Sequence, residues 1–135
     1  MNPVVHFEMP YEDKNRMASF YTKAFGWKPQ MLGPEIGSYV VMTTSEMDEK
    51  TKFPKKPGRI NGGFFKKSAG HNNTTVVIAV DDIQDAMKKV AAAGGKVVGG
   101  SKPGIPDNIP GIGLYIAILD TEGNKVALLQ PNPRM

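Results

Sequence analysis

The chain has 135 residues, with 17 Lys and Arg against 13 Asp and Glu, which gives a formal net charge of +4. It contains no cysteine, which excludes disulfides, zinc–thiolate centres and a cysteine nucleophile. The length is that of one domain, enough for a hydrophobic core without covalent cross-links.

The chain opens with a predicted strand that has one polar face. Residues alternate over 4–9, so Val5, Phe7 and Met9 share one face while His6 and Glu8 lie on the other. Pro10 cannot donate to a sheet and closes the strand. A strand face that carries an imidazole and a carboxyl group is unusual and marks these two residues for attention.

A helix is predicted next. Asp13 is a suitable N-cap, and apolar residues recur at helical spacing from Met17 to Phe25. Gly26 is expected to end the helix, because glycine readily takes the left-handed conformation found after many helices.

The rest of the first half predicts three strands. These are a short edge strand over 27–32, a strand over 37–44 rich in β-branched residues, and a strand over 59–67. Residues 45–58 form a long loop without apolar periodicity. Gly62 and Gly63 in the last strand indicate either a bulge or sheet bend, or a close approach by a ligand or another backbone.

The second half repeats this order. A strand over 75–80 precedes a helix that is capped by Asp82 and ends before Gly94. A weak strand over 96–100, a loop over 101–111 and a hairpin of strands 113–119 and 125–130 follow. Residues 1–135 therefore predict a single α+β domain of two βαβββ modules, 1–67 and 75–135, with no further helix of comparable length.

The sequence shows neither a signal peptide nor an apolar run of membrane-spanning length, so we expect a cytoplasmic protein without a membrane partner. Basic residues gather in the loop from Lys50 to Arg59, where no aromatic residues alternate with them. This favours a solvated loop over a nucleic-acid surface. Steering of a small anionic ligand towards a nearby cleft is a third interpretation.

Six short motifs, in order and at characteristic spacing, span nearly the whole chain. They are H-F-E-x-P at 6–10, S-F-Y-T-K-A-F-G-W at 19–27, N-G-G-F at 61–64, V-D-D-I at 80–83, A-x-x-G-G at 91–95 and D-T-E-G-N at 120–124. In these motifs the chain resembles the vicinal-oxygen-chelate superfamily, the group of glyoxalase I, bleomycin-resistance proteins and extradiol dioxygenases. It is most similar to the lactoylglutathione-lyase-related, glyoxalase-like branch.

The resemblance implies a curled mixed sheet with a central cleft, in which four strands each supply one ligand to a divalent metal. His6 matches the first ligand, fourteen residues before Phe20. The fourth strand lacks the carboxylate found in relatives, and the remaining two positions correspond to Thr75 and Ala127. We therefore expect no metal; the alternative is zinc, nickel, manganese or iron at His6.

His6 and Glu8 have two interpretations. They are either a structural pair satisfied by each other or by neighbouring groups, or a catalytic pair in which Glu8 sets the pKa of a proton-carrying His6. The residues proposed to bind a ligand in the cleft are Tyr39, Asn61, Phe64, Thr75, Tyr115 and Ala127. Trp27 is a further candidate for the cleft wall.

Two classes of function are open. The first is a protein that binds a small organic molecule without the full family metal site, as the bleomycin-resistance branch does. The second is an enzyme of the lyase, isomerase or dioxygenase type, with or without a metal. The resemblance also implies a homodimer, and short modules with many apolar strand residues agree with pairing.

Overall fold

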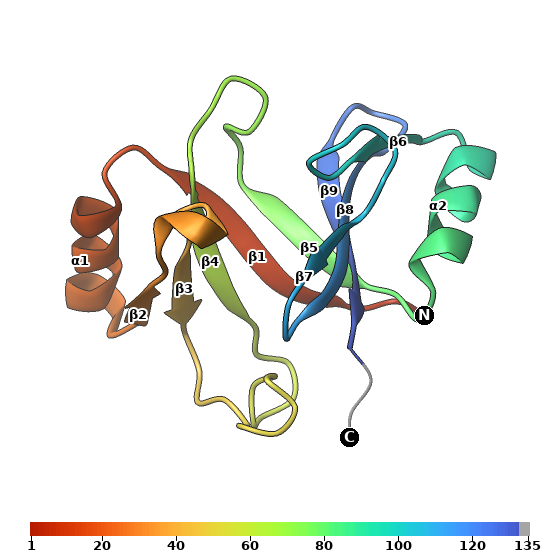
Figure 1. Cartoon of the computed structure of the whole chain (residues 1–135). Coiled ribbons are helices and arrows are strands. Elements are labelled where there is room, and N and C mark those ends of the chain that lie inside the picture. Colours follow the sequence, from red (N-terminus) through yellow and green to blue (C-terminus); the bar gives the residue numbers. More distant parts are fainter. Residues whose placement is uncertain (133–135) are drawn as a thin grey trace. The chain divides into compact units, whose positions relative to one another are not determined.

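The computed structural model describes residues 1–132 and divides into two compact units. The first unit is Val5–Thr74, and the second is Met1–Val4 together with the chain from Thr75 onward (Figure 1). Residues 133–135 of the predicted second module lie outside the described residues. Each unit is described by itself below.

The first unit holds one α-helix and a four-stranded sheet. Its elements are β1 (Val4–Tyr11, of which only Val4 falls in the second unit), α1 (Lys14–Phe25), β2 (Lys28–Met31), the short 3₁₀ helix η1 (Pro34–Ile36), β3 (Val40–Thr43) and β4 (Asn61–Lys66). The strand order is β2-β3-β4-β1, with β4 parallel to β1 and the other neighbours antiparallel. The predicted order of one strand, one helix and three strands is confirmed, with η1 as an added turn of helix.

The second unit follows the same path. Its elements are β5 (Thr75–Ala79), α2 (Ile83–Ala92), β6 (Lys96–Gly99), β7 (Asp107–Ile109), β8 (Gly113–Leu119) and β9 (Lys125–Pro131). The strand order is β5-β9-β8-β6, with β5 parallel to β9. Both units thus follow the βαβββ plan, to which the second unit adds the short strand β7, and the predicted α+β fold class is confirmed.

The strand β7 corrects one expectation, because residues 101–111 are predicted as loop. Asp107, Asn108 and Ile109 pair antiparallel with Tyr115, Leu114 and Gly113 of β8. The Pro- and Gly-rich composition shortens this strand to three residues but does not prevent it, since β8 offers backbone partners to it.

The predicted helix ends are confirmed. The carboxylate of Asp13 accepts a hydrogen bond from the backbone N–H of Arg16 at 3.0 Å, and Gly26 has φ +75°. Asp82 caps α2 in the same way, accepting from the N–H of Asp85 at 3.1 Å. Local sequence therefore sets where both helices begin.

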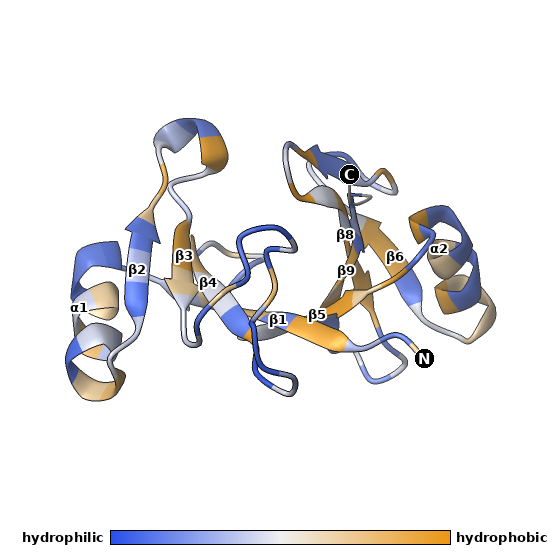
Figure 2. Ribbon diagram, turned by 90° about the horizontal axis from the view of Figure 1, so that it is seen from below, coloured by the Kyte–Doolittle hydropathy of each residue, from blue (hydrophilic) through white to orange (hydrophobic). Residues whose placement is uncertain are grey.

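Each helix covers one face of the sheet of its own unit. In the first unit, Met17 and Tyr21 of α1 pack against a core formed by the buried residues Tyr11, Val40, Met42 and Phe64. In the second, α2 packs against a core of Val80, Ile83, Ile116, Ile118 and Leu128. Figure 2 shows β3, which carries Val40 and Met42, in the colour of hydrophobic residues.

The glycine pair of β4 accommodates aromatic rings on both sheet faces. The β1–β4 register is regular from His6↔Asn61 onward, so the pair forms no bulge. A Cβ atom on Gly62 would overlap the ring of Phe7, and one on Gly63 would overlap the ring of Tyr39. The close approach indicated by the two glycines is therefore made by side chains of the same unit.

Replacing Gly62 with alanine should destabilise the first unit by about 1–3 kcal/mol, because the Phe7 ring must leave its position between Gly62 and Trp27. Chemical denaturation measures this loss. Gly70→Ala is the matched control, since an added Cβ there meets no atom within 4 Å. Equal stability of the two variants would contradict the assigned packing.

Candidate functional site

The sheet face of the first unit that lies opposite α1 carries the polar residues of β1. In the parallel register His6 pairs with Asn61 and Glu8 with Gly63. Paired residues of neighbouring strands project to the same face, so His6, Glu8 and Asn61 share it. Phe7 and the helix-side core occupy the other face.

His6 contacts a residue 33 positions away. Its Nε2 atom lies 3.0 Å from the hydroxyl of Tyr39, which forms a hydrogen bond whose direction is set by the imidazole tautomer. Tyr39 stands immediately before β3, and its ring lies over the backbone of Gly63. A residue with a side chain at position 63 would exclude the ring from this place.

Burial lowers the pKa of His6 below its ordinary value of 6.5, and the nearby negative charge of Glu8 offsets only part of that effect. The imidazole is therefore neutral near pH 7. A neutral imidazole has one nitrogen that donates and one that accepts, so it can receive a proton.

Asn61 is held in one orientation. Its Oδ1 atom accepts hydrogen bonds from the backbone N–H groups of Thr44 at 2.8 Å and Ser45 at 2.9 Å. These donors fix which end of the amide is the oxygen. The Nδ2 atom is buried, and among residues 1–132 it has no hydrogen-bond partner.

We refer to His6, Glu8, Tyr39 and Asn61 as the polar cluster. Glu8 and Asn61 are each only 8% exposed. All four belong to the first unit and were predicted as site residues from the sequence.

Phe64 does not join this cluster. It is fully buried and packs in the helix-side core with Val40, Met42 and Tyr21. It pairs with Met9, so strand alternation places it on the face opposite His6. Trp27 likewise lies on the helix side, where it stacks on Tyr21 at a centroid distance of 4.7 Å. The structure thus places Phe64 on the helix side, and its predicted contact with a ligand stays a prediction.

The remaining predicted residues belong to the second unit. Thr75 and Ala127 are buried, and Ala127 pairs with Val77 of β5 and Ala117 of β8. Tyr115 lies on the same strand face as Ala117, two residues along β8. These three predicted residues thus share the face of their own sheet opposite α2.

The donor set does not fit a divalent metal. Within the described chain, no three His, Cys, Asp or Glu side chains converge as a metal site would require. The β4 residue across from His6 is Asn61, whose oxygen is occupied by two N–H groups and whose other polar atom is itself a donor. A cation needs lone pairs, which the Nδ2 atom does not offer.

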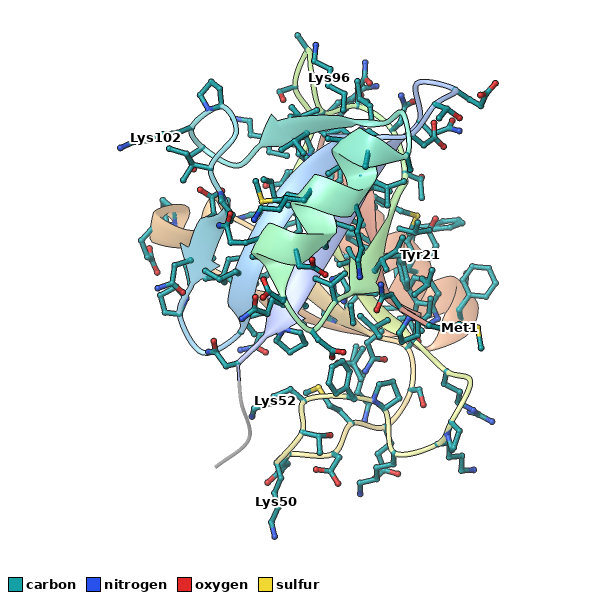
Figure 3. The ribbon with its side chains drawn as sticks, turned by 90° about the vertical axis from the view of Figure 1, so that its right-hand side faces the viewer. Met1, Tyr21, Lys50, Lys52, Lys96 and Lys102 are labelled. Atoms are coloured by element: carbon teal, nitrogen blue, oxygen red, sulfur yellow. The ribbon has the colours of Figure 1, made fainter. Side chains whose placement is uncertain are left out.

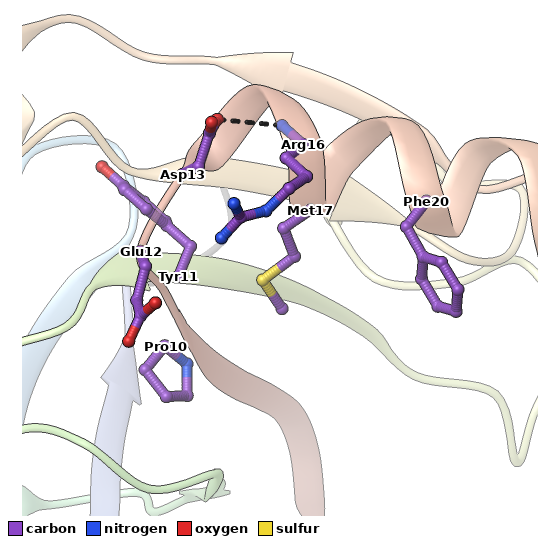
Figure 4. Close-up of a pocket in the computed structure, with 7 residues that line it drawn as sticks. All are labelled: Pro10, Tyr11, Glu12, Asp13, Arg16, Met17 and Phe20. Carbon is purple, nitrogen blue, oxygen red and sulfur yellow. Dashed lines mark hydrogen bonds between the residues drawn. The ribbon is translucent and has the colours of Figure 1, made fainter.

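A surface pocket of about 400 Å³ lies where β1 meets α1 (Figure 4). Seven residues line it: Pro10, Tyr11, Glu12, Asp13, Arg16, Met17 and Phe20. Its carboxylates already have structural partners, because Glu12 pairs with Lys67 at 3.3 Å and Asp13 caps α1. Sequence reasoning did not point to this pocket, and its carboxylates are explained by these contacts.

The basic loop is internally organised. The carboxylate of Asp48 accepts from the N–H groups of Lys50 at 2.8 Å and Thr51 at 3.0 Å, and Lys55 pairs with exposed Glu46 at 3.4 Å. Lys50 and Lys52 extend outward from the loop (Figure 3). These features support the interpretation of a solvated loop.

The chain belongs to the Glyoxalase/Bleomycin resistance protein/Dioxygenase superfamily, whose sequence model matches residues 4–128. No functionally curated protein matches the sequence. The family confirms the resemblance recognised in the six motifs.

Solved structures share the fold at low identity. A hypothetical protein from Bacillus halodurans C-125 is 10% identical with a TM-score of 0.67, covering 99% of this chain and 97% of its own. Methylmalonyl-CoA epimerase from Mycobacterium tuberculosis is 11% identical with a TM-score of 0.64, at 96% and 88% coverage. A variant of the Streptomyces coelicolor epimerase is 9% identical with a TM-score of 0.68, at 99% and 97% coverage.

None of the helices within residues 1–132 has the length and apolar character needed to cross a membrane.

The lowered pKa of His6 predicts a pH-dependent stability. The unfolded chain takes up a proton at His6 near pH 6.5, whereas the folded chain resists it until lower pH. The free energy of unfolding should therefore fall as pH drops below about 6.5, and should level off below the folded pKa.

Chemical denaturation between about pH 7.5 and pH 5 measures this slope. His6→Gln should flatten it, because the variant has no imidazole at position 6 to titrate. An unchanged slope in His6→Gln would show that another group is responsible.

Proposed function

We propose that the first unit binds a small organic molecule at the polar cluster. The observation that carries this proposal is the set of polar side chains His6, Glu8 and Asn61 on one sheet face, with Tyr39 joined to it through His6. Buried polar groups are costly unless they have hydrogen-bond partners. A binding role accounts for their concentration on the face that the helix-side core does not use.

The chemistry of the cluster suits recognition by a few directional bonds. His6 is neutral near pH 7, Tyr39 carries a hydroxyl, and Asn61 offers an N–H donor. A ligand site commonly combines a small number of such groups with apolar walls. Family membership agrees with a small-molecule role but leaves the ligand open, because one fold serves many functions.

A second candidate is acid–base catalysis of the isomerase type. The hydrogen bond between His6 and Tyr39 favours it, because a neutral imidazole beside a hydroxyl group can accept and return a proton. Structural neighbours named methylmalonyl-CoA epimerase share the fold. The lyase and dioxygenase alternatives have no comparable observation in their favour.

A homodimer is also part of this proposal. The aromatic residues Phe20 and Phe25 of α1 are 57% and 62% exposed, so α1 presents apolar surface beyond its own unit. Light scattering should return twice the chain mass of 14.7 kDa. The double variant Phe20→Ser/Phe25→Ser should shift this mass towards one chain. A mass near 14.7 kDa for the unaltered protein would refute the dimer.

The binding proposal is tested by analysing small molecules that accompany the purified protein. Native mass spectrometry of the unaltered chain should show an added organic mass, which solvent extraction releases and identifies. His6→Ala should lose most of it while unfolding at a similar denaturant concentration, because His6 belongs to the polar cluster and not to the helix-side core.

His71→Ala is the matched control, because it removes the only other histidine of the sequence from a position outside the polar cluster. It should retain the added mass. Equal retention by both variants, or unfolding of His6→Ala alone, would support a purely structural role for His6.

A further inference from the structure

The unsatisfied amide group of Asn61 is the most specific feature of the polar cluster. Its oxygen accepts from Thr44 and Ser45, and also lies 3.3 Å from the hydroxyl of Thr44. These contacts join the end of β3 to the start of β4. The oxygen thus has a structural role, which leaves the Nδ2 atom as the free end of the group.

The buried Nδ2 atom is a donor without an acceptor. Asn61 is 92% buried, and Nδ2 has no partner in the described part of the chain. A buried donor without an acceptor destabilises the fold, because it has lost its hydrogen bonds to water. Exchanging the positions of the amide oxygen and nitrogen of Asn61 would not give the nitrogen an acceptor. The NH₂ group would then face the backbone N–H groups of Thr44 and Ser45, which are donors themselves.

We propose that Asn61 Nδ2 donates a hydrogen bond to the carbonyl oxygen of a neutral ligand. The proposal rests on the proposed binding function and adds a ligand class to it. The register supports it, since Asn61 pairs with His6 and both side chains lie on the same face of the sheet.

The charge of the cluster favours a neutral carbonyl over a carboxylate. Glu8 lies two residues from His6 on the same strand face and is itself buried. His6, which burial keeps neutral near pH 7, adds no positive charge to this face. An anionic acceptor therefore gains no cationic partner from His6 or Glu8, whereas a ketone, amide or ester oxygen accepts the hydrogen bond without bringing a charge into the buried cluster.

The proposal is tested first on the unaltered protein. N,N-dimethylacetamide is the probe, because it has a carbonyl acceptor and no N–H donor. Its titration should move the side-chain amide signals of Asn61 in ¹H–¹⁵N spectra to a saturating limit. Acetate at equal concentration should move them much less. The exposed Asn108 amide serves as an internal control and should not move.

A variant provides the second measurement. Asn61→Asp keeps an oxygen for Thr44 and Ser45 but removes the donor, so its affinity for the probe should fall about tenfold or more. Asn108→Asp makes the same charge change at an exposed position of β7 and should keep the original affinity. If Asn61→Asp does not fold, the titration of the unaltered chain decides alone.

The outcomes separate this inference from the binding function on which it rests. Probe-induced shifts at His6 and Tyr39 but not at Asn61 would overturn the carbonyl assignment and leave the binding site in place. Equal shifts with acetate would overturn the preference for neutral ligands. An Asn61 amide that contacts only water, with no shift at any residue of the polar cluster, would overturn both.

Discussion

The parallel pairing of β1 with β4 is the constraint on which the first unit depends. It sets His6 beside Asn61, Phe7 beside Gly62 and Glu8 beside Gly63, and thereby assigns every one of these residues to a face. A shift by one residue would exchange the two faces, placing the imidazole and carboxyl groups against the helix-side core. Gly62 and Gly63 are compatible with this register, because each leaves room for an aromatic ring on one face of the sheet.

That register also sets which group lies beside His6, the one residue that matches a family ligand position. The β4 position across from His6 holds Asn61, and its oxygen is bound by backbone N–H groups of the turn after β3. The group left over is a donor, which repels a cation and attracts an acceptor oxygen. A member of this superfamily can thus carry a hydrogen-bond donor at this position, because the fold by itself does not fix the chemistry of the site.

The second unit shows which features of the fold both units share and which residues differ between them. It repeats the parallel pairing of its first and last strands and covers one face with a helix. Its opposite face carries Thr75, Val77 and Ala127 in place of an imidazole and a carboxyl group. The strand path is thus compatible with a polar or a largely apolar face, because only the helix side must be apolar throughout.

The sequence by itself determined the α+β fold class, the ends of both helices and the presence of one polar and one apolar face on β1. These depend on interactions within a few residues, such as the bond from Asp13 to the N–H of Arg16 or the alternation around His6. Only the tertiary structure decided that Tyr39 reaches His6 across 33 positions, that Phe64 lies on the helix side and that Asn61 keeps a free donor. Those outcomes depend on which strand pairs with which and in what register, and no local pattern of residues specifies that pairing.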